Sequence, residues 1–550
     1  MSGLVGRMCR GWPWLLAVLS GLLLVLCYAP FGFGNLSWVA LAPLIAGVWF
    51  SETAGRREIL RLGGLGFVFG MFYFGGSLAW LATLTIPGWI LLSLYLALYP
   101  ALWTAFLGTF IRPTGLSRRG EPVWMGSWHN LRVAFLGAAA CVALEWVRGV
   151  FLSGFGWDGL GIALARNVAL IQITDVTGVG GLSFLIVFAN LIAVVTVRRL
   201  IEEFRRGARR PHYDFAVTVG VVTLAWLYGL RQMMAPAPAS VPLTFAAVQA
   251  NVPQATRNDP AFEDEVMERY RKHTNAAMAL KPDLLLWPES ATPRPIFNDQ
   301  GTWEMVRELA DGFPGDMLLG TVHYDERGGY NSAALLSGRG EAAQMHHKMH
   351  LVPFGEFVPF RQGFPFFAWV VGDLVPDDFD AGSYPEVLEM AARPVKIGAL
   401  ICFEDTLGDL AREFVLRGAQ IFAVVTNDGW FLRSAGSRQH LDNAVFRCAE
   451  NKIPMIRAAN TGVTCLVDRF GVVRQELRSP EGSTFIEGVL FGRAEVPANP
   501  APTFYARHGE VFSIGCILVA VATMAAGWIG LRKKKDSACS RPGETKISGG

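Results

Sequence analysis

The sequence predicts a chain built from two unlike parts, a multi-pass α-helical membrane domain and an α/β domain outside the bilayer. Hydrophobic residues make up 52% of its 550 residues and charged residues only 17%, which is too apolar a balance for an ordinary soluble protein. Long apolar runs occupy both ends of the chain. Between them, short strand-like runs and amphipathic helical stretches recur, a pattern typical of a sheet covered by helices.

Residues 1–235 are dominated by apolar runs, and a helix needs about 20 apolar residues to cross a bilayer. Seven runs here are candidate spans, and an eighth lies near the C-terminus. They are Trp12–Tyr28, Leu36–Phe50, Leu62–Leu84, Gly88–Ile111, Val133–Phe151, Gly180–Val197, Phe215–Leu230 and Val511–Leu531, of which the first, second and seventh are short. No small-residue cleavage site follows the first run, so we expect an uncleaved helix and eight transmembrane helices in total.

Arginine and lysine residues cluster before the first run and after the second, fourth, sixth and eighth runs. The clusters contain Arg7, Arg10, Arg56, Arg57, Arg61, Arg112, Arg118, Arg119, Arg132, Arg198, Arg199, Arg205, Arg206, Arg209, Arg210, Arg532, Lys533, Lys534 and Lys535. Because cytoplasmic loops are rich in these residues, both termini are predicted to be cytoplasmic. The segment between the seventh and eighth runs is then outside, which in a bacterial cell means the periplasm.

The composition changes at a Pro/Ala-rich stretch, residues 236–242, which is predicted to be a linker. The α/β segment follows at 243–497, the last span lies within 498–535, and the polar tail 536–550 is expected to be disordered and cytoplasmic. The strand-like runs are Leu243–Val248, Asp283–Trp287, Met317–Thr321, Ser332–Leu336, Val395–Cys402, Ile421–Thr426 and Val463–Val467. The helical stretches are Phe262–Leu280, Thr302–Gly312, Leu407–Arg417 and Gln439–Asn451.

Three polar residues in the α/β segment could together perform acyl transfer. Glu289 lies just past one buried strand, Cys402 ends another, and Lys348 lies between them in the chain. A thiol attacks a carbonyl only as the thiolate, so it needs a nearby base, for which Glu289 is the candidate. Lys348 could stabilise the oxyanion that forms on attack. Each residue also has an ordinary alternative, as core filling, a turn acid and a solvated charge.

Other kinds of site are less well supported. The net charge of +3 does not favour a nucleic-acid partner, and the eight cysteines include no C-x-x-C pair, which argues against a metal cluster or a disulfide framework. His346, His347 and His350 invite a zinc site, but they lack the helical acid–histidine pattern of one, so no metal is expected.

Several motifs add a resemblance to known families. Trp287-Pro288-Glu289-Ser290, Lys348 before Leu351–Glu356, and Ile401-Cys402-Phe403-Glu404 resemble the Glu–Lys–Cys triad of the nitrilase superfamily. Further segments are similar to the apolipoprotein N-acyltransferase family, in chain order from Leu26 to about Leu531. They are Tyr28–Phe33, Glu145–Gly149, Thr177–Phe184, Val248–Gln254, Thr426–Phe431 and Thr503–Gly509.

The resemblance implies eight membrane helices and a periplasmic αββα sandwich, held in the bacterial inner membrane. It implies transfer of a fatty acyl chain from a phospholipid to the α-amine of the S-diacylglyceryl-cysteine of an apolipoprotein, without a cofactor. By position, Glu289 is the general base, Lys348 the oxyanion-stabilising cation and Cys402 the nucleophile. Glu356 matches a further essential carboxylate, and Glu404, Asn427 and Trp430 match positions that shape the active site or its mobile loops. We expect a monomer.

This sequence departs from the family pattern at two places, which bear on substrate details rather than on the reaction. His346 stands where members commonly have Tyr, and Arg257 and Asn258 stand where many have a Trp. The aromatic stretch Phe357–Val371 could be a lid that dips into lipid or a packed core helix.

Two other functions stay open from the residues alone. One is a membrane-anchored nitrilase-type amidase that acts on small C–N substrates. The other is a transporter with a sensor domain, although intramembrane charges are few, Glu145 and Arg148 being the main pair.

Overall fold

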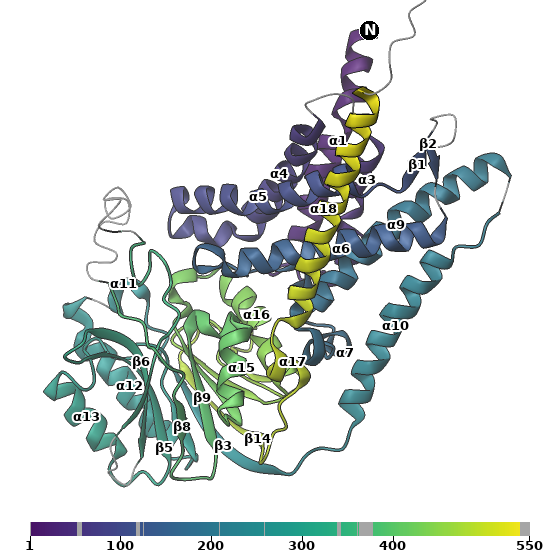
Figure 1. The fold of residues 1–550 in the computed structure, drawn as a ribbon. Coiled ribbons are helices and arrows are strands. Elements are labelled where there is room, and N and C mark those ends of the chain that lie inside the picture. The colour runs from purple at the N-terminus through teal and green to yellow at the C-terminus, as the bar shows by residue number, and fades with distance from the viewer. Residues whose placement is uncertain are drawn as a thin grey trace, which may run out of the picture.

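The computed structural model describes residues 2–51, 58–116, 122–124, 126–207, 209–257, 259–337, 343–359, 361 and 378–539. Helices from both ends of the chain form one part of the molecule, and two β-sheets with their covering helices form the other (Figure 1).

Among the described residues, the helical part contains ten N-terminal α-helices, a small hairpin and two C-terminal α-helices. The helices are α1 (Ser2–Val25), α2 (Ser37–Ala40), α3 (Ala42–Phe50), α4 (Glu58–Ser77), α5 (Ile86–Phe110), α6 (Ser127–Val150), α7 (Val168–Ile171), α8 (Thr174–Thr177), α9 (Val179–Arg206), α10 (Tyr213–Met234), α17 (Phe504–His508) and α18 (Val511–Cys539). The hairpin strands, β1 (Thr114–Leu116) and β2 (Pro122–Trp124), lie between α5 and α6.

In the described part of the chain, six helices are long and apolar enough to cross a membrane, namely α4, α5, α6, α9, α10 and α18. They correspond to the third to eighth predicted runs. The first predicted run lies in α1, whose apolar portion Gly11–Val25 is shorter, and the second is divided between α2 and α3. Helix α18 continues past residue 535, where the sequence predicts the start of a disordered tail, and residues 540–550 lie outside the described part.

Helices α4 and α5 approach closely because glycines of α4 face α5. A Cβ at Gly66 would lie 2.2 Å from the carbonyl oxygen of Pro100, and one at Gly70 would lie 2.7 Å from the Cα of Ala97. Small residues at such positions allow membrane helices to pack backbone against backbone. A larger residue at Gly66 would therefore force the two helices apart.

Glu145 and Arg148 do not form the ion pair that their spacing suggests. Both lie near the end of α6, and each holds the loop that follows. The Glu145 carboxylate accepts a hydrogen bond from the backbone N–H of Leu160 at 2.8 Å, and Arg148 donates to the carbonyl of Trp157 at 3.1 Å. The two charges therefore fix a loop next to the α/β part.

The α/β part contains two six-stranded sheets, with strand orders β14-β3-β4-β5-β6-β7 and β13-β12-β11-β10-β9-β8. The strands are β3 (Ser240–Gln249), β4 (Leu284–Leu286), β5 (Asp316–Tyr324), β6 (Gly329–Ser337), β7 (Gln344–His347), β8 (Val387–Glu389), β9 (Lys396–Ile401), β10 (Ile421–Thr426), β11 (Met455–Ala459), β12 (Cys465–Val467), β13 (Val473–Glu476) and β14 (Gly488–Pro497). Strands β3, β4 and β5 run parallel to one another, as do β9, β10 and β11.

The two sheets pack face to face and helices cover their outer faces. Phe245 and Leu286 of the first sheet meet Ile397 and Ala423 of the second in one buried core. The first sheet is covered by α12 (Glu263–Met278) and α13 (Gln300–Ala310), and the second by α15 (Gly408–Leu416) and α16 (Gly436–Asn451). The result is an αββα sandwich whose α15 and α16 layer faces the membrane helices (Figure 1).

Gln439 of α16 joins the two parts of the molecule. Its side-chain oxygen accepts hydrogen bonds from the indole N–H groups of Trp80 at 2.9 Å and Trp157 at 3.0 Å. Its amide nitrogen donates to the carbonyls of Ala29 and Ser77, both at 2.9 Å. One buried side chain therefore connects three segments of the helical part to the sandwich.

Seven of the twelve sandwich strands in the described residues were predicted from the sequence, whereas β7, β8, β11, β13 and β14 were not. Strand β8 is too short to show a pattern, and β7 is mostly polar. Strand β11 is interrupted by a charged residue, Arg457, which is fully buried.

Candidate active site

Cys402 is the first residue after β9 and has a backbone φ of +54°. This is the left-handed region, which a non-glycine residue occupies only when its surroundings hold it there. Burial and the Glu289 carboxylate raise the pKa of the Cys402 thiol, while Lys348 and a hydrogen bond with Thr426 oppose the rise. The thiol is therefore protonated at rest and needs a base before it can attack.

Glu289 follows β4 and reaches across to the second sheet. Its Oε2 accepts a hydrogen bond from the backbone N–H of Asn427 at 2.9 Å, and Asn427 comes directly after β10. Its Oε1 accepts from the Nδ2 of Asn331 at 2.7 Å and lies 3.5 Å from the Nζ of Lys348. The carboxyl ends of parallel strands in both sheets thus meet at one place.

Lys348 follows β7 and is only 1% exposed. Its Nζ lies 2.9 Å from the Oε1 of Glu356 and 3.5 Å from Glu289. Burial disfavours the ammonium charge, but the Glu356 and Glu289 carboxylates outweigh burial and raise the pKa of Lys348. The site therefore holds a permanent, desolvated cation.

Glu356 and Asn331 complete this cluster. The Oε2 of Glu356 accepts from the backbone N–H of Val352 at 2.8 Å, and its Oε1 accepts from Asn331 at 2.8 Å. Asn331, on β6, thereby donates to both carboxylates. Asn331 was not among the residues predicted from the sequence, although it is a polar residue directly before the strand-like run Ser332–Leu336.

Glu404 joins the lysine segment to the cysteine strand. Its Oε1 accepts from the backbone N–H groups of Met349 at 2.7 Å and His350 at 3.1 Å, and its Oε2 accepts from Ile401 at 2.9 Å. Burial alone would raise the pKa of Glu404, but the neighbouring His346, a hydrogen bond from the Ile401 backbone N–H and the charge of Lys348 lower it. Glu404 is therefore a buried carboxylate with three backbone donors.

Asn427 belongs to the same cluster, whereas Trp430 does not touch it. The Asn427 side chain accepts from Asn460 at 3.0 Å and donates to Gln254 at 3.0 Å. Trp430, in the turn after β10, is 37% exposed, and within the described residues no hydrogen bond or ring contact joins it to the cluster.

The two departures from the family pattern both lie near these residues. The buried His346 has its Nε2 3.9 Å from the Oε2 of Glu404. Arg257 donates to the carbonyl of Ser290 at 2.7 Å, next to Glu289. Burial lowers the pKa of Arg257, and Glu289 opposes that change. Asn258 and most of the stretch Phe357–Val371 lie outside the described residues.

A buried charge network supports the loops that carry Cys402 and Asn427. His440 lies 2.8 Å from Asp405 and 2.9 Å from Asp428, and Arg457 contacts both carboxylates. Burial alone would lower the pKa of His440, but Asp405 outweighs burial and raises it to about 9. The pKa of Asp428 falls to about 2 because Arg457 and His440 overcome its burial.

The three histidines that suggested zinc have other partners. His346 adjoins Glu404, His347 forms a 2.8 Å hydrogen bond with Ser332, and His350 stacks on Phe403. Within the described ranges, no group of three or more His, Cys, Asp or Glu side chains could hold a metal ion.

Comparisons with known proteins match both parts of the chain. Residues 20–192 match the apolipoprotein N-acyltransferase N-terminal domain, and residues 244–490 match the carbon-nitrogen hydrolase domain. A solved CN-hydrolase superfamily protein from Xanthomonas campestris is 18% identical, with a TM-score of 0.35, over 46% of this chain and 90% of that chain.

Relatives that match along nearly their whole length show the family of this chain. An apolipoprotein N-acyltransferase from Geobacter metallireducens is 35% identical over 531 residues, which are 93% of this chain and 94% of the relative. One from Nitrosomonas europaea is 30% identical over 91% of this chain and 94% of its own length. Because these sequence matches extend through both parts of the molecule, this chain belongs to the apolipoprotein N-acyltransferase family.

Proposed function

We propose that this chain transfers a fatty acyl group from a phospholipid, through a thioester on Cys402, to the α-amine of the N-terminal S-diacylglyceryl-cysteine of an apolipoprotein. The observation that carries this proposal is the buried cluster of Glu289, Lys348 and Glu356 beside the strand end that bears Cys402. It offers a base, a fixed cation and a nucleophile in one place. Because all of them come from one chain, we propose that the enzyme acts as a monomer.

In the first half of the reaction, Glu289 takes the proton of the Cys402 thiol and the thiolate attacks the ester carbonyl of the phospholipid. The ammonium of Lys348 stabilises the oxyanion of the tetrahedral intermediate. The C–O bond of the ester then breaks, Glu289 returns its proton to the leaving oxygen, and lysophospholipid departs.

In the second half, the acceptor amine attacks the thioester carbonyl while Glu289 takes a proton from its nitrogen. Lys348 again stabilises the oxyanion. The C–S bond breaks, and the Cys402 thiolate leaves and regains a proton from Glu289. The two half-reactions share one site, so the kinetics are ping-pong.

The remaining residues hold these groups in position. Asn331 and Glu356 fix the lysine and one oxygen of Glu289. The backbone of Asn427 fixes the other oxygen, and Glu404 keeps the lysine segment against the cysteine strand. Trp430 belongs to the turn after Asn427, and we assign it to substrate entry rather than to the reaction.

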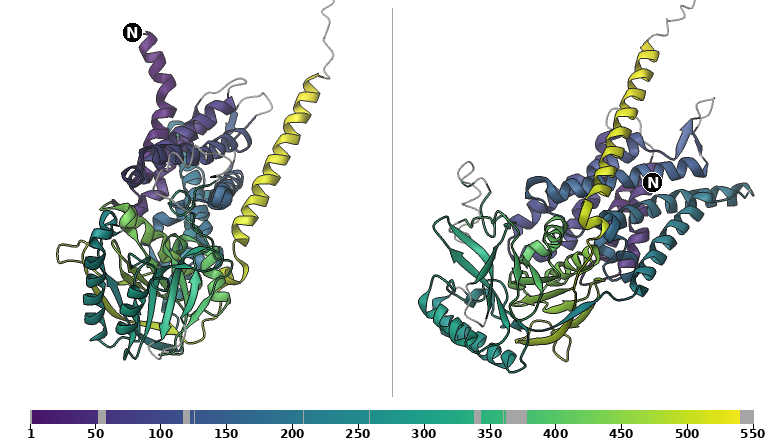
Figure 2. Two further views of the ribbon diagram at one scale, coloured as in Figure 1. Left: turned by 90° about the vertical axis from the view of Figure 1, so that its left-hand side faces the viewer. Right: turned by 60° about the horizontal axis from the view of Figure 1, so that its bottom comes forward.

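The proposed setting is a bacterial inner membrane crossed eight times, with the catalytic domain in the periplasm. In this arrangement residues 1–235 carry seven spans, 236–242 a linker, 243–497 the catalytic domain, 498–535 the eighth span and 536–550 a cytoplasmic tail. The free ends of α1 and α18 both project on the side of the helical part away from the sheets, which supports two cytoplasmic termini (Figure 1; Figure 2, left).

Intact mass spectrometry of the detergent-solubilised protein tests the scheme. Phospholipid alone should add one acyl mass to the wild type, and a diacylglyceryl-cysteine peptide should then remove it. Cys402→Ala should add none, whereas Cys516→Ala, which removes a free cysteine of α18, should behave as wild type. A wild-type chain that never gains acyl mass but hydrolyses small amides would instead support the amidase alternative.

A further inference from the structure

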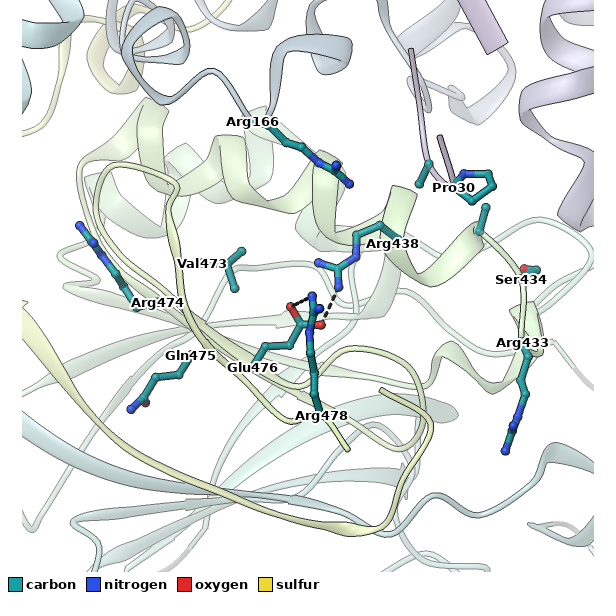
Figure 3. A pocket seen from close by; sticks show the side chains of 12 residues that line it. Pro30, Arg166, Arg433, Ser434, Arg438, Val473, Arg474, Gln475, Glu476 and Arg478 are labelled. Atoms are coloured by element: carbon teal, nitrogen blue, oxygen red, sulfur yellow. Dashed lines mark hydrogen bonds and ion pairs between the residues drawn. The ribbon is translucent and has the colours of Figure 1, made fainter. Parts of the chain in front are cut away.

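A second polar site lies outside the catalytic cluster, in a cavity of about 980 Å³ between the helical part and the sandwich. Ala29 and Pro30, which follow α1, form one side together with Arg166, which precedes α7. The start of α16 and strand β13 with the residues after it form the rest (Figure 3).

Arginine dominates the lining of this cavity. The charged lining residues are Arg166, Arg433, Arg438, Arg474, Arg478 and Glu476. Glu476 lies 2.5 Å from Arg438 and 2.7 Å from Arg478, as the dashed lines in Figure 3 show. Despite burial, these two arginines lower the pKa of Glu476. The carboxylate thus stays charged and fixes two guanidinium groups at the cavity wall.

Two of the arginines have no carboxylate of their own. Among the residues that the structure describes, neither Arg166 nor Arg433 forms an ion pair, and Arg433 lies over the ring of Phe485 at 5.9 Å. The guanidinium of Arg166 lies against Gly32, where a Cβ would come within 2.6 Å of it. Both side chains therefore keep N–H donors for another acceptor.

Nearby carboxylates reduce the positive charge without cancelling it. Arg474 pairs with Asp468, which lies outside the lining. Asp442 lies close by and is half-buried, and partial burial raises its pKa to about 6 against the opposing charges of Arg438 and Arg166. Five arginines face Glu476, Asp468 and Asp442, so the cavity still attracts an anion near neutral pH.

Trp157 connects the residue after Cys402 with helix α16, whose start lines the cavity. The Trp157 ring stacks on Phe403, next to Cys402, with a centroid distance of 6.3 Å. The indole N–H of the same Trp157 bonds to Gln439, next to Arg438, at 3.0 Å. One aromatic side chain therefore contacts both the cysteine turn and the helix that begins at the cavity.

We propose that this arginine-lined cavity binds the headgroup phosphate of the phospholipid acyl donor, a role that rests on the function proposed above. A guanidinium matches the two oxygens of a phosphate with paired N–H donors. The cavity lies where loops of the helical part meet the α/β part, and in the setting proposed above this is the level of the phospholipid phosphodiesters. Two arginines held by Glu476 and two without ion-pair partners provide a prearranged set of donors.

The test measures acyl-enzyme formation on the full-length protein in detergent with two donors, a phospholipid and a fatty acyl p-nitrophenyl ester that has no phosphate. Arg433→Gln removes an arginine without leaving a partner carboxylate unpaired, and Arg166→Gln removes one that lies near Asp442 but, within the described residues, forms no ion pair with it. Each should raise the KM for phospholipid about 10- to 150-fold, since a hydrogen bond to a charged group contributes about 1.5–3 kcal/mol. The rate with the p-nitrophenyl ester should stay unchanged.

Arg493→Gln is the matched control, because Arg493 is an exposed arginine of β14 paired with Glu495. It should change neither KM. Inorganic phosphate should compete with phospholipid in the wild type and less in the two cavity variants. If one variant fails to fold, the other still gives the comparison.

The outcomes separate this inference from the proposed function. An unchanged phospholipid KM in both cavity variants would overturn the headgroup assignment while acyl-enzyme still forms. If the arginines affect inhibition by inorganic phosphate but not the phospholipid KM, the cavity is a free-anion site and the headgroup assignment is again wrong. Absence of acyl mass with both donors in the wild type would refute the thioester scheme itself.

Discussion

Glu404→Gln tests whether Glu404 positions the site or acts as its base. The buried carboxylate holds Met349 and His350 with one oxygen and Ile401 with the other. Glutamine has nearly the same shape but only one accepting oxygen. In either orientation of the amide, its NH₂ group faces at least one backbone N–H, so that hydrogen bond is lost.

The free-energy cost of Glu404→Gln follows from the number of hydrogen bonds that it changes. A hydrogen bond to a charged group contributes about 1.5–3 kcal/mol, and a buried N–H left without an acceptor costs about 1–3 kcal/mol. The sum is about 2.5–6 kcal/mol. If most of this free energy is lost because Cys402 is displaced relative to Lys348, acyl-enzyme formation should slow about 10²–10³-fold, since about 1.4 kcal/mol corresponds to a factor of ten.

Single-turnover acylation with phospholipid, followed by intact mass, measures this rate across a range of pH. Because the pKa of Glu404 is already lowered, the carboxylate is ionised over the working range, and its replacement should leave the shape of the pH–rate profile unchanged. Glu289→Gln should remove acylation altogether, and Glu386→Gln, at an exposed glutamate, serves as the control. A wild-type rate in Glu404→Gln, or a loss as complete as in Glu289→Gln, would contradict the positioning role.

Three further predictions concern the residues around the reaction centre. Asn331→Ala removes the donor shared by Glu289 and Glu356, so acylation should slow about 10²-fold without vanishing, and equal rates for variant and wild type would rule out this role. The pKa of His440 is raised from 6.5 to about 9, so its contribution of about 3 kcal/mol to stability is complete below pH 6.5 and lost as the pH rises through 9. The unfolding midpoint should therefore fall more between pH 6.5 and 9.5 in the wild type than in His440→Gln, and parallel decreases would count against it. Gln439→Ala leaves two indole N–H groups and two carbonyls without their partner, which should lower the free energy of unfolding by about 3–5 kcal/mol. The thermal midpoint should therefore be lower than in the exposed-site control Gln300→Ala. An unchanged midpoint would show that this junction does not contribute to stability.

The main elements were predictable where their signal is local. The third to eighth apolar runs became the six long apolar helices because their length and composition are properties of contiguous sequence. Strands β9 and β10 were likewise visible as short apolar runs with polar ends. The second predicted span is instead divided between α2 and α3, which length and hydropathy alone do not reveal.

Burial of charge was not predictable from local pattern. Strand β11 was not predicted because it contains Arg457, and burying a charged residue is unfavourable unless charged or hydrogen-bonding partners are present. Its partners, Asp405 and Asp428, lie elsewhere in the chain and become neighbours only after folding. The same holds for Asn331, whose role depends on hydrogen bonds to two carboxylates on other segments.

By itself, the sequence determined that a membrane-spanning helical part adjoins an α/β part, and it identified Glu289, Lys348 and Cys402 as candidates from strand ends and motifs. Only the tertiary structure determined which groups meet: Asn331 between two carboxylates, Glu404 between two segments, and five arginines around one cavity. The physical reason is that hydropathy and strand pattern depend on residues that are neighbours in the sequence. Hydrogen bonds and charge contacts depend on distances between segments that the chain brings together only when it folds.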